Sequence, residues 1–166
     1  MPNHVDQDLW VTGPTETLKE FLEFAKEGEA ILSANKFIPY PEKYMVMDKE
    51  AEVSRKKDPP DYSVKDGFNS GGYEWCVQNW GTKWGIYDAA MIGSKLEGKT
   101  GHLKFRFNSA WSPPTPVILA MSEKFHSLHF KLKYYESGMQ YQGIYIAQAN
   151  QVLEESDGAY KGGRGG

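Results

Sequence analysis

Basic side chains alternate with apolar ones along two segments in the second half of the chain. In residues 102–107 and 128–134 every second residue is apolar, and the residues between are Lys, Arg or His. Successive side chains of a strand point to opposite faces, so each segment predicts a strand with one apolar and one basic face. The basic-face positions are His102, Lys104, Arg106, His129, Lys131 and Lys133.

A tryptophan is expected among these cations. Residues 6–12 also alternate as a strand, and in the common order of a split β-α-β sheet this first strand lies between the other two. Trp10 would then share their face, in the way that aromatic side chains on RNA-binding sheets stack single-stranded bases beside phosphate-binding cations. The alternative is that the cations only solvate outward positions and discourage edge pairing. The outward positions of 102–109 lack the aromatics of the RNA-recognition consensus.

A second candidate surface is the segment of residues 79–84. Trp80 and Trp84 flank a glycine turn and Lys83, a spacing that favours a stacking or cation–π clamp. The alternative places both indoles in the core beside Trp75 and Trp111.

Other site chemistry has little support. His126 and His129 have no carboxylate or cysteine at metal-ligand spacing, and the sequence has no glycine-rich phosphate loop or nucleophile motif. Asp88 and Glu136 remain as acid–base candidates. Cys76 is the only cysteine, which excludes an intramolecular disulfide and an iron–sulfur cluster and fits a reducing cytosol. We expect no cofactor and no metal.

Composition shows an uneven charge and many rings. The 166 residues carry 19 Lys and Arg against 22 Asp and Glu, a net charge of −3, yet residues 75–150 hold eight basic and four acidic side chains. Aromatic residues make up 14% of the chain, and five are Trp. With a mean hydropathy of −0.60, the chain has no apolar run that predicts a membrane span and no signal-peptide pattern. We therefore expect no membrane association.

The first half predicts a helix and an insertion after the first strand. The helix begins near Leu18, where Thr17 and Glu20 can form a capping box, and ends at Gly28. Residues 29–85 are interpreted as a partly irregular insertion. Its expected parts are a weak surface helix over 42–57 and a loop over 58–72.

The second half predicts a hairpin, a helix and two further strands. The hairpin turns at Gly98–Gly101, and a helix capped by Ser112 runs to about Phe125. Residues 151–166 are interpreted as a flexible C-terminal tail. The strands are expected at 86–93, 102–109, 128–135 and 141–147.

This element order predicts an α+β ferredoxin-like sandwich. The pattern is β-α-β-β-α-β plus an extra C-terminal strand, in a single domain over residues 1–150 with the insertion at about 29–85. Two helices would cover one face of the sheet. The other face, with the basic side chains, would be open unless the insertion covers it.

Four stretches resemble the YubB-like ferredoxin-like domain proteins of phages, prophages and plasmids. They are Met1-Pro2-Asn3 with Leu9–Pro14, Trp75 with Asn79–Trp84, Ala110–Pro116, and Tyr134–Gly138 with Tyr141–Gly143. The chain departs from the family at His4-Val5, where a Trp-Cys pair is usual, and at Gly85, where an acidic residue is usual. The resemblance implies the ferredoxin-like fold, a mobile-element origin and the cytoplasm of a bacterial host. It implies neither electron transfer nor catalytic residues.

These observations lead to one hypothesis and two alternatives. We expect a non-enzymatic binding protein of a phage or plasmid that modulates or occludes a host component: a host protein, a nucleotide signal or a nucleic acid. The first alternative is a small nucleotide- or phosphoester-directed enzyme, with His102 or His129 acting between the 79–84 loop and the basic face. The second is a structural or assembly subunit. The residues expected to contact the ligand or partner are Trp10, Trp80, Lys83, Trp84, Lys104, Arg106, Lys131 and Lys133.

Overall fold

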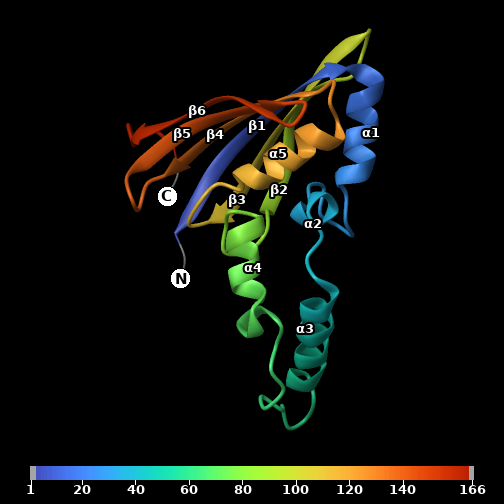
Figure 1. Cartoon of the computed structure of the whole chain (residues 1–166), viewed down its shortest axis with the longest axis vertical. Coiled ribbons are helices and arrows are strands. Elements are labelled where there is room, and N and C mark those ends of the chain that lie inside the picture. Colours follow the sequence, from blue (N-terminus) through green and yellow to red (C-terminus); the bar gives the residue numbers. More distant parts are fainter. Residues whose placement is uncertain (1–2, 165–166) are drawn as a thin grey trace.

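An antiparallel six-stranded sheet forms the body of the protein in the computed structural model (Figure 1). The structure describes residues 3–164, so Met1 and Pro2 of the resemblance and the last two residues of the expected tail lie outside the described part. The sheet order is β2-β3-β1-β4-β5-β6, with β1 between β3 and β4 as predicted. The strands are β1 (His4–Pro14), β2 (Tyr87–Lys95), β3 (Thr100–Ala110), β4 (His129–Glu136), β5 (Tyr141–Gln148) and β6 (Gln151–Ala159).

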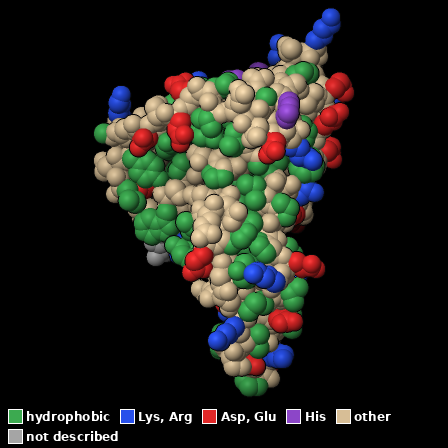
Figure 2. Space-filling model, in the orientation of Figure 1, with side chains coloured by type: hydrophobic (Ala, Val, Ile, Leu, Met, Phe, Trp, Pro, Cys, Tyr) green, Lys and Arg blue, Asp and Glu red, His purple; other side chains and the backbone are tan. Residues whose placement is uncertain are grey.

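Two helices, α1 and α5, cover one face of the sheet, and the rest of the helical structure lies mainly in an arm that projects from it (Figure 1). The arm comprises residues 42–79. Figure 2 shows acidic, basic and hydrophobic side chains interspersed along it, which is typical of a solvated surface. The helical elements are α1 (Thr15–Ala25), α2 (Ala34–Phe37), α3 (Glu42–Arg55), the short 3₁₀ helix η1 (Phe68–Ser70), α4 (Gly72–Asn79) and α5 (Thr115–Lys124).

The core lies between the sheet and these two helices. Leu9, Leu103 and Phe105 are fully buried on the helix-covered face, as the alternation predicts. Phe21 of α1 is central to this layer, because its ring contacts four other phenylalanine rings from α2, β3, β4 and the residue that follows α5. The ferredoxin-like fold is therefore confirmed.

Both predicted helix caps are wrong. Helix α1 begins at Thr15, so Thr17 already lies inside its first turn, and no side-chain cap forms. The Thr15 amide instead donates to the Lys99 carbonyl, 3.0 Å away in the β2–β3 turn. Helix α5 begins after Pro114 with no side-chain cap, and the Ser112 hydroxyl donates to the Gly81 carbonyl instead of accepting from a helix amide. A tertiary contact therefore satisfies the first amide of α1, whereas Ser112 is engaged outside α5.

The insertion is more ordered than its sequence indicates. The surface helix is present as α3, and 58–72 is mostly loop, but α2 and α4 were not predicted. At the base of the arm the Tyr40 ring packs against Trp75 and Trp80. These rings fix the arm to the body.

The C-terminal segment differs most from its predicted form. Residues 151–159, expected as part of a flexible tail, form β6 and pair with β5 along its length. All nine β6 residues are exposed, so the strand has no buried face and lacks the alternation that would identify it. Strand β6 is therefore a second strand beyond the β-α-β-β-α-β pattern, after β5, and it is held by backbone pairing rather than by apolar burial.

Cys76 is buried against the base of the arm, where burial and the nearby Asp48 carboxylate raise the pKa of its thiol to about 11. Because the thiolate is the reactive form, we expect negligible reaction of the native protein with a thiol reagent at pH 8. In denaturant the same thiol should react fully. A stoichiometric reaction without denaturant would contradict this packing.

Candidate functional site

The uncovered face of the sheet carries Trp10 among lysines. Lys104 on β3 and Lys131 on β4 lie directly opposite Trp10 in the two flanking strands. Their ammonium nitrogens lie 4.7 and 5.7 Å from the centroid of the indole ring, and that of Lys133 lies 5.9 Å away. Three cations therefore surround one half-buried ring on an open surface. The predicted combination of ring and cations is assembled here.

The next row of the open face contains an acidic residue that is not among the predicted site residues. Asp8 lies opposite Arg106 on one side and Lys133 on the other. The Arg106 Nε lies 3.2 Å from an Asp8 carboxylate oxygen. Arg106 therefore belongs to the face as predicted, but its charge is partly balanced within the protein.

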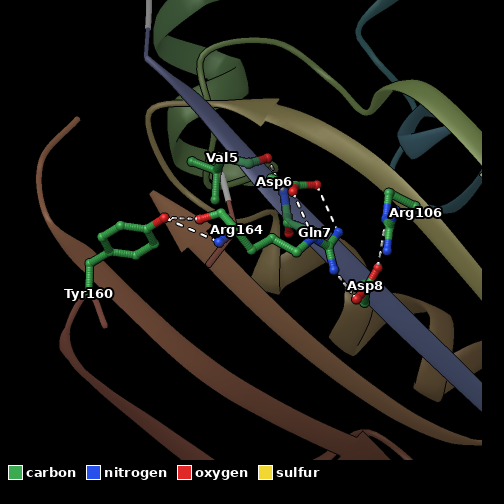
Figure 3. A network of polar contacts seen from close by, with 7 residues as sticks. All are labelled: Val5, Asp6, Gln7, Asp8, Arg106, Tyr160 and Arg164. Carbon is green, nitrogen blue, oxygen red and sulfur yellow. Dashed lines mark hydrogen bonds and ion pairs between the residues drawn. The ribbon is translucent and has the colours of Figure 1, made fainter. Parts of the chain in front are cut away.

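Residues 160–164, the last that the structure describes, fold back onto this face (Figure 3). We call Tyr160–Arg164 the C-terminal strap. The Arg164 guanidinium forms hydrogen bonds of 2.8 and 2.9 Å with Asp6 and also binds Asp8. It lies over the Tyr135 ring, with its central carbon 5.3 Å from the centroid. The strap thus pairs one guanidinium with the Asp6 and Asp8 carboxylates of the open face, and Arg106 supplies the second positive charge at Asp8.

The strap contact should respond to acid. Burial acts to raise the pKa of Asp8, but the hydrogen bonds and charges of Arg164 and Arg106 outweigh it and hold the pKa below its usual value. A lowered pKa stabilises the folded form above the ordinary Asp value of about 3.9, and this stabilisation is lost as the pH falls through the lowered pKa. We expect the strap to remain docked from neutral pH down to about pH 4 and to detach below it.

Amide NMR signals of Gly162 and Gly163, followed from pH 7 to pH 2.5, would measure this release, with sheet signals as the control for global unfolding. An Asp8→Asn variant should show a more mobile strap already at pH 7. Movement of the glycine signals between pH 7 and 5 in the unaltered chain would contradict the assignment.

A hollow of about 400 Å³ adjoins the strap on the open face. It continues from β4 across β5 and β6, where Gln142, Ile144 and Ser156 line it. Its basic lining residues are Lys133 and Lys161. The hollow joins the surface around Trp10 through Lys133.

The 79–84 segment does not join this site. Trp80 is 7% exposed, and its indole nitrogen donates to the Ile38 carbonyl at 2.8 Å, so its predicted place on a binding surface is wrong. Lys83 and Trp84 do pair, with the ammonium 5.0 Å from the indole centroid. They lie near the Ala110 end of β3, to which the Lys83 amide is bonded.

The histidines expected to act beside that segment, His102 on β3 and His129 on β4, lie at the opposite end of the sheet. His102 and His129 both lie opposite Thr12 of β1. His102 is eight residues from Ala110 on β3, which corresponds to about 27 Å along that strand. A site between the 79–84 loop and either histidine is therefore not formed. Within residues 3–164, no group of three or more His, Cys, Asp or Glu side chains is placed to hold a metal ion.

Comparison with known proteins identifies the family. A family model described as the ferredoxin-like domain in Api92-like protein matches residues 79–162. The chain belongs to this family. The match covers β2 to β6 and the start of the strap, whereas β1 with Trp10 precedes it. Comparison with the curated proteins finds no match.

The fold of this Api92-like chain also resembles a solved structure. The crystal structure of a protein api92 from Yersinia pseudotuberculosis aligns with a TM-score of 0.58 and 9% sequence identity, covering 99% of this chain and 100% of that one. At this identity the likeness concerns the fold alone. No helix within residues 3–164 is long and apolar enough to cross a membrane.

Proposed function

We propose that this Api92-like chain is a non-enzymatic binding protein whose open sheet face holds a ligand that combines a flat base with phosphate. The observation that carries the proposal is the half-buried Trp10 ring with three lysine ammonium groups within 6 Å of its centroid. An indole stacks on any base, and the lysines supply charge for phosphate. Nucleotides and single-stranded nucleic acids share this chemistry.

The arrangement of the lysines supports a ligand rather than an internal role. A lysine ammonium is a compact charge on a flexible stem, so each can move from the indole to a phosphate without backbone change. Lys104, Lys131 and Lys133 form no ion pair with a carboxylate among the described residues. Their charges are therefore available to a ligand.

The biological setting is part of the same proposal. The four stretches that resemble YubB-like proteins support an origin in a phage or plasmid, and the lone buried cysteine is compatible with the cytoplasm of a bacterial host. In that setting the protein would occlude a host nucleotide or nucleic acid.

The test compares three ligands at 50 mM salt: a mononucleotide, a fluorescein-labelled single-stranded octathymidylate and, as a competitor without bases, inorganic polyphosphate. We expect the two base-containing ligands to bind, and polyphosphate to compete less well than unlabelled octathymidylate of equal charge. Binding of polyphosphate alone would show that the ring has no role. Absence of binding by both base-containing ligands at low salt would overturn the proposal.

A second candidate function has one observation in its favour. His102 and His129 lie on either side of Thr12 on the open face, where one could accept a proton from an attacking hydroxyl and the other could protonate a leaving oxygen. The prediction for this phosphoester-directed enzyme is cleavage of single-stranded RNA that His102→Ala and His129→Ala each abolish. Intact RNA after prolonged incubation would remove this candidate.

A further inference from the structure

The hollow beside the strap is a continuation of the Trp10 site. Lys133 is common to both, because its ammonium lies 5.9 Å from the Trp10 centroid and its side chain lines the hollow. Ile144 and Ser156 line the hollow from β5 and β6, two and three strands away from Trp10. At about 4.8 Å per strand this is about 10 to 14 Å, farther than a base lies from its own phosphate.

The strap is fixed in place at several points. The Tyr160 amide donates to the Gln140 carbonyl at 3.0 Å, and the Lys161 amide donates to the Gln142 side-chain oxygen at 2.9 Å. Gly162 and Gly163 have φ values of +83° and +88°, a left-handed conformation that glycine adopts without steric cost. This double glycine turns the chain. Arg164, which follows it, reaches the Asp6 and Asp8 carboxylates (Figure 3). Lys161 is therefore held at the rim of the hollow.

The charges around the hollow favour an anion. Lys133 and Lys161 border it, while Arg164 and Arg106 together balance the Asp6 and Asp8 carboxylates farther along the face. Asp157 also borders the hollow, but it lies opposite Gly143 of β5. Gly143 is on the same sheet face as the buried Tyr145, which is the face that the helices cover. The Asp157 carboxylate therefore points away from the open face.

We infer that the hollow is a second subsite, which binds the phosphate of a neighbouring nucleotide, so that the ligand of the open face is a single strand of several nucleotides. The inference rests on the proposed function and names its substrate class. The docked strap completes the subsite: Lys161 supplies a cation, and Arg164 is a positioning residue that holds the strap and masks two carboxylates.

The test measures binding of dTMP, (dT)2, (dT)4 and (dT)8 at 50 mM salt, followed by a salt series with (dT)8. The variants are Lys161→Gln, Arg164→Gln and, as the matched control, Lys57→Gln at an exposed position in the arm. We expect affinity to rise at least tenfold from dTMP to (dT)4. Lys161→Gln should weaken (dT)8 binding by about 3- to 10-fold and lower the salt slope by about 0.7, with little change for dTMP. Arg164→Gln should likewise weaken binding of (dT)8 and change the affinity for dTMP little.

The outcomes separate the two proposals. If dTMP and the longer strands bind with equal affinity, or if Lys161→Gln behaves like Lys57→Gln, the second subsite is wrong and the proposed function stands. If none of the four ligands binds, the proposed function fails and the subsite fails with it. Equal effects of Lys161→Gln on dTMP and (dT)8 would place the lysine at the first nucleotide and also overturn the subsite.

Discussion

Replacing Trp10 by alanine is expected to weaken binding of a single-stranded octathymidylate by about 10- to 100-fold. Stacking of a base on an aromatic side chain contributes about 1–3 kcal/mol by alanine substitution, and each 1.4 kcal/mol corresponds to about tenfold in affinity. The fold should be retained, because Trp10 points to the open face, away from the core that Leu9 and Val11 help to form. Fluorescence anisotropy with labelled (dT)8 measures the affinity, and thermal unfolding monitors the fold.

Two variants make this result specific. Trp10→Phe keeps a ring and should recover much of the lost affinity, whereas Tyr62→Ala removes a ring that is 74% exposed in the arm and should change nothing. If Trp10→Ala binds as tightly as the unaltered chain, or if Tyr62→Ala weakens binding to the same degree, the indole is not the stacking platform.

Replacing Phe21 by alanine is expected to lower the free energy of unfolding by about 3–5 kcal/mol. Phe21 is fully buried, and its ring centroid lies within 6.2 Å of those of Phe37, Phe105, Phe125 and Phe130. These rings come from different elements around α1, so they cannot all move to fill the space. Urea unfolding followed by circular dichroism measures the change.

The matched control for this substitution is Val53→Ala on the arm helix α3. Val53 is 62% exposed, so its loss should alter the free energy of unfolding by about 0.5 kcal/mol or less. A loss below about 1 kcal/mol for Phe21→Ala would contradict the central place of this ring in the core.

The open face was predictable because its signal is periodic. Alternation in β1, β3 and β4 assigned Trp10, Lys104 and Lys131 to one face, and the ferredoxin-like strand order placed β1 between the other two. The pattern of basic residues did not indicate that Asp6 and Asp8, which point to the same face as Trp10, would lie among them. The signal for both carboxylates is nevertheless in the sequence, because Asp6 and Asp8 alternate in step with Trp10.

The strap was not predictable from local sequence. The run Gly162-Gly163-Arg164 is typical of a flexible end, and its order comes from partners more than 150 residues away, the carboxylates of Asp6 and Asp8. Strand β6 is exposed throughout and gives no apolar period. Contacts of this kind depend on the assembled sheet, so sequence pattern alone does not contain them.

The five tryptophans differ in how far their positions could be predicted from the sequence. Trp80 is in the core, and Trp75 packs against it at the base of the arm. Trp84 lies beside Tyr87 with Lys83 over its ring. Trp111 is 42% exposed, with its carbonyl bonded to the Tyr141 hydroxyl. Strand alternation predicted the sheet face of Trp10 alone, because the other four tryptophans lie in α4 or in loops.

Photo-crosslinking of a bromodeoxyuridine-substituted single strand, mapped by mass spectrometry, tests the location of the ligand most directly. Irradiation joins the modified base to the aromatic side chain on which it stacks. We expect the main adduct to lie on the β1 peptide that contains Trp10, and unlabelled (dT)8 to suppress it. Adducts confined to the Trp84 or Tyr62 peptides, with the Trp10 peptide unmodified, would contradict a binding site on the open sheet face.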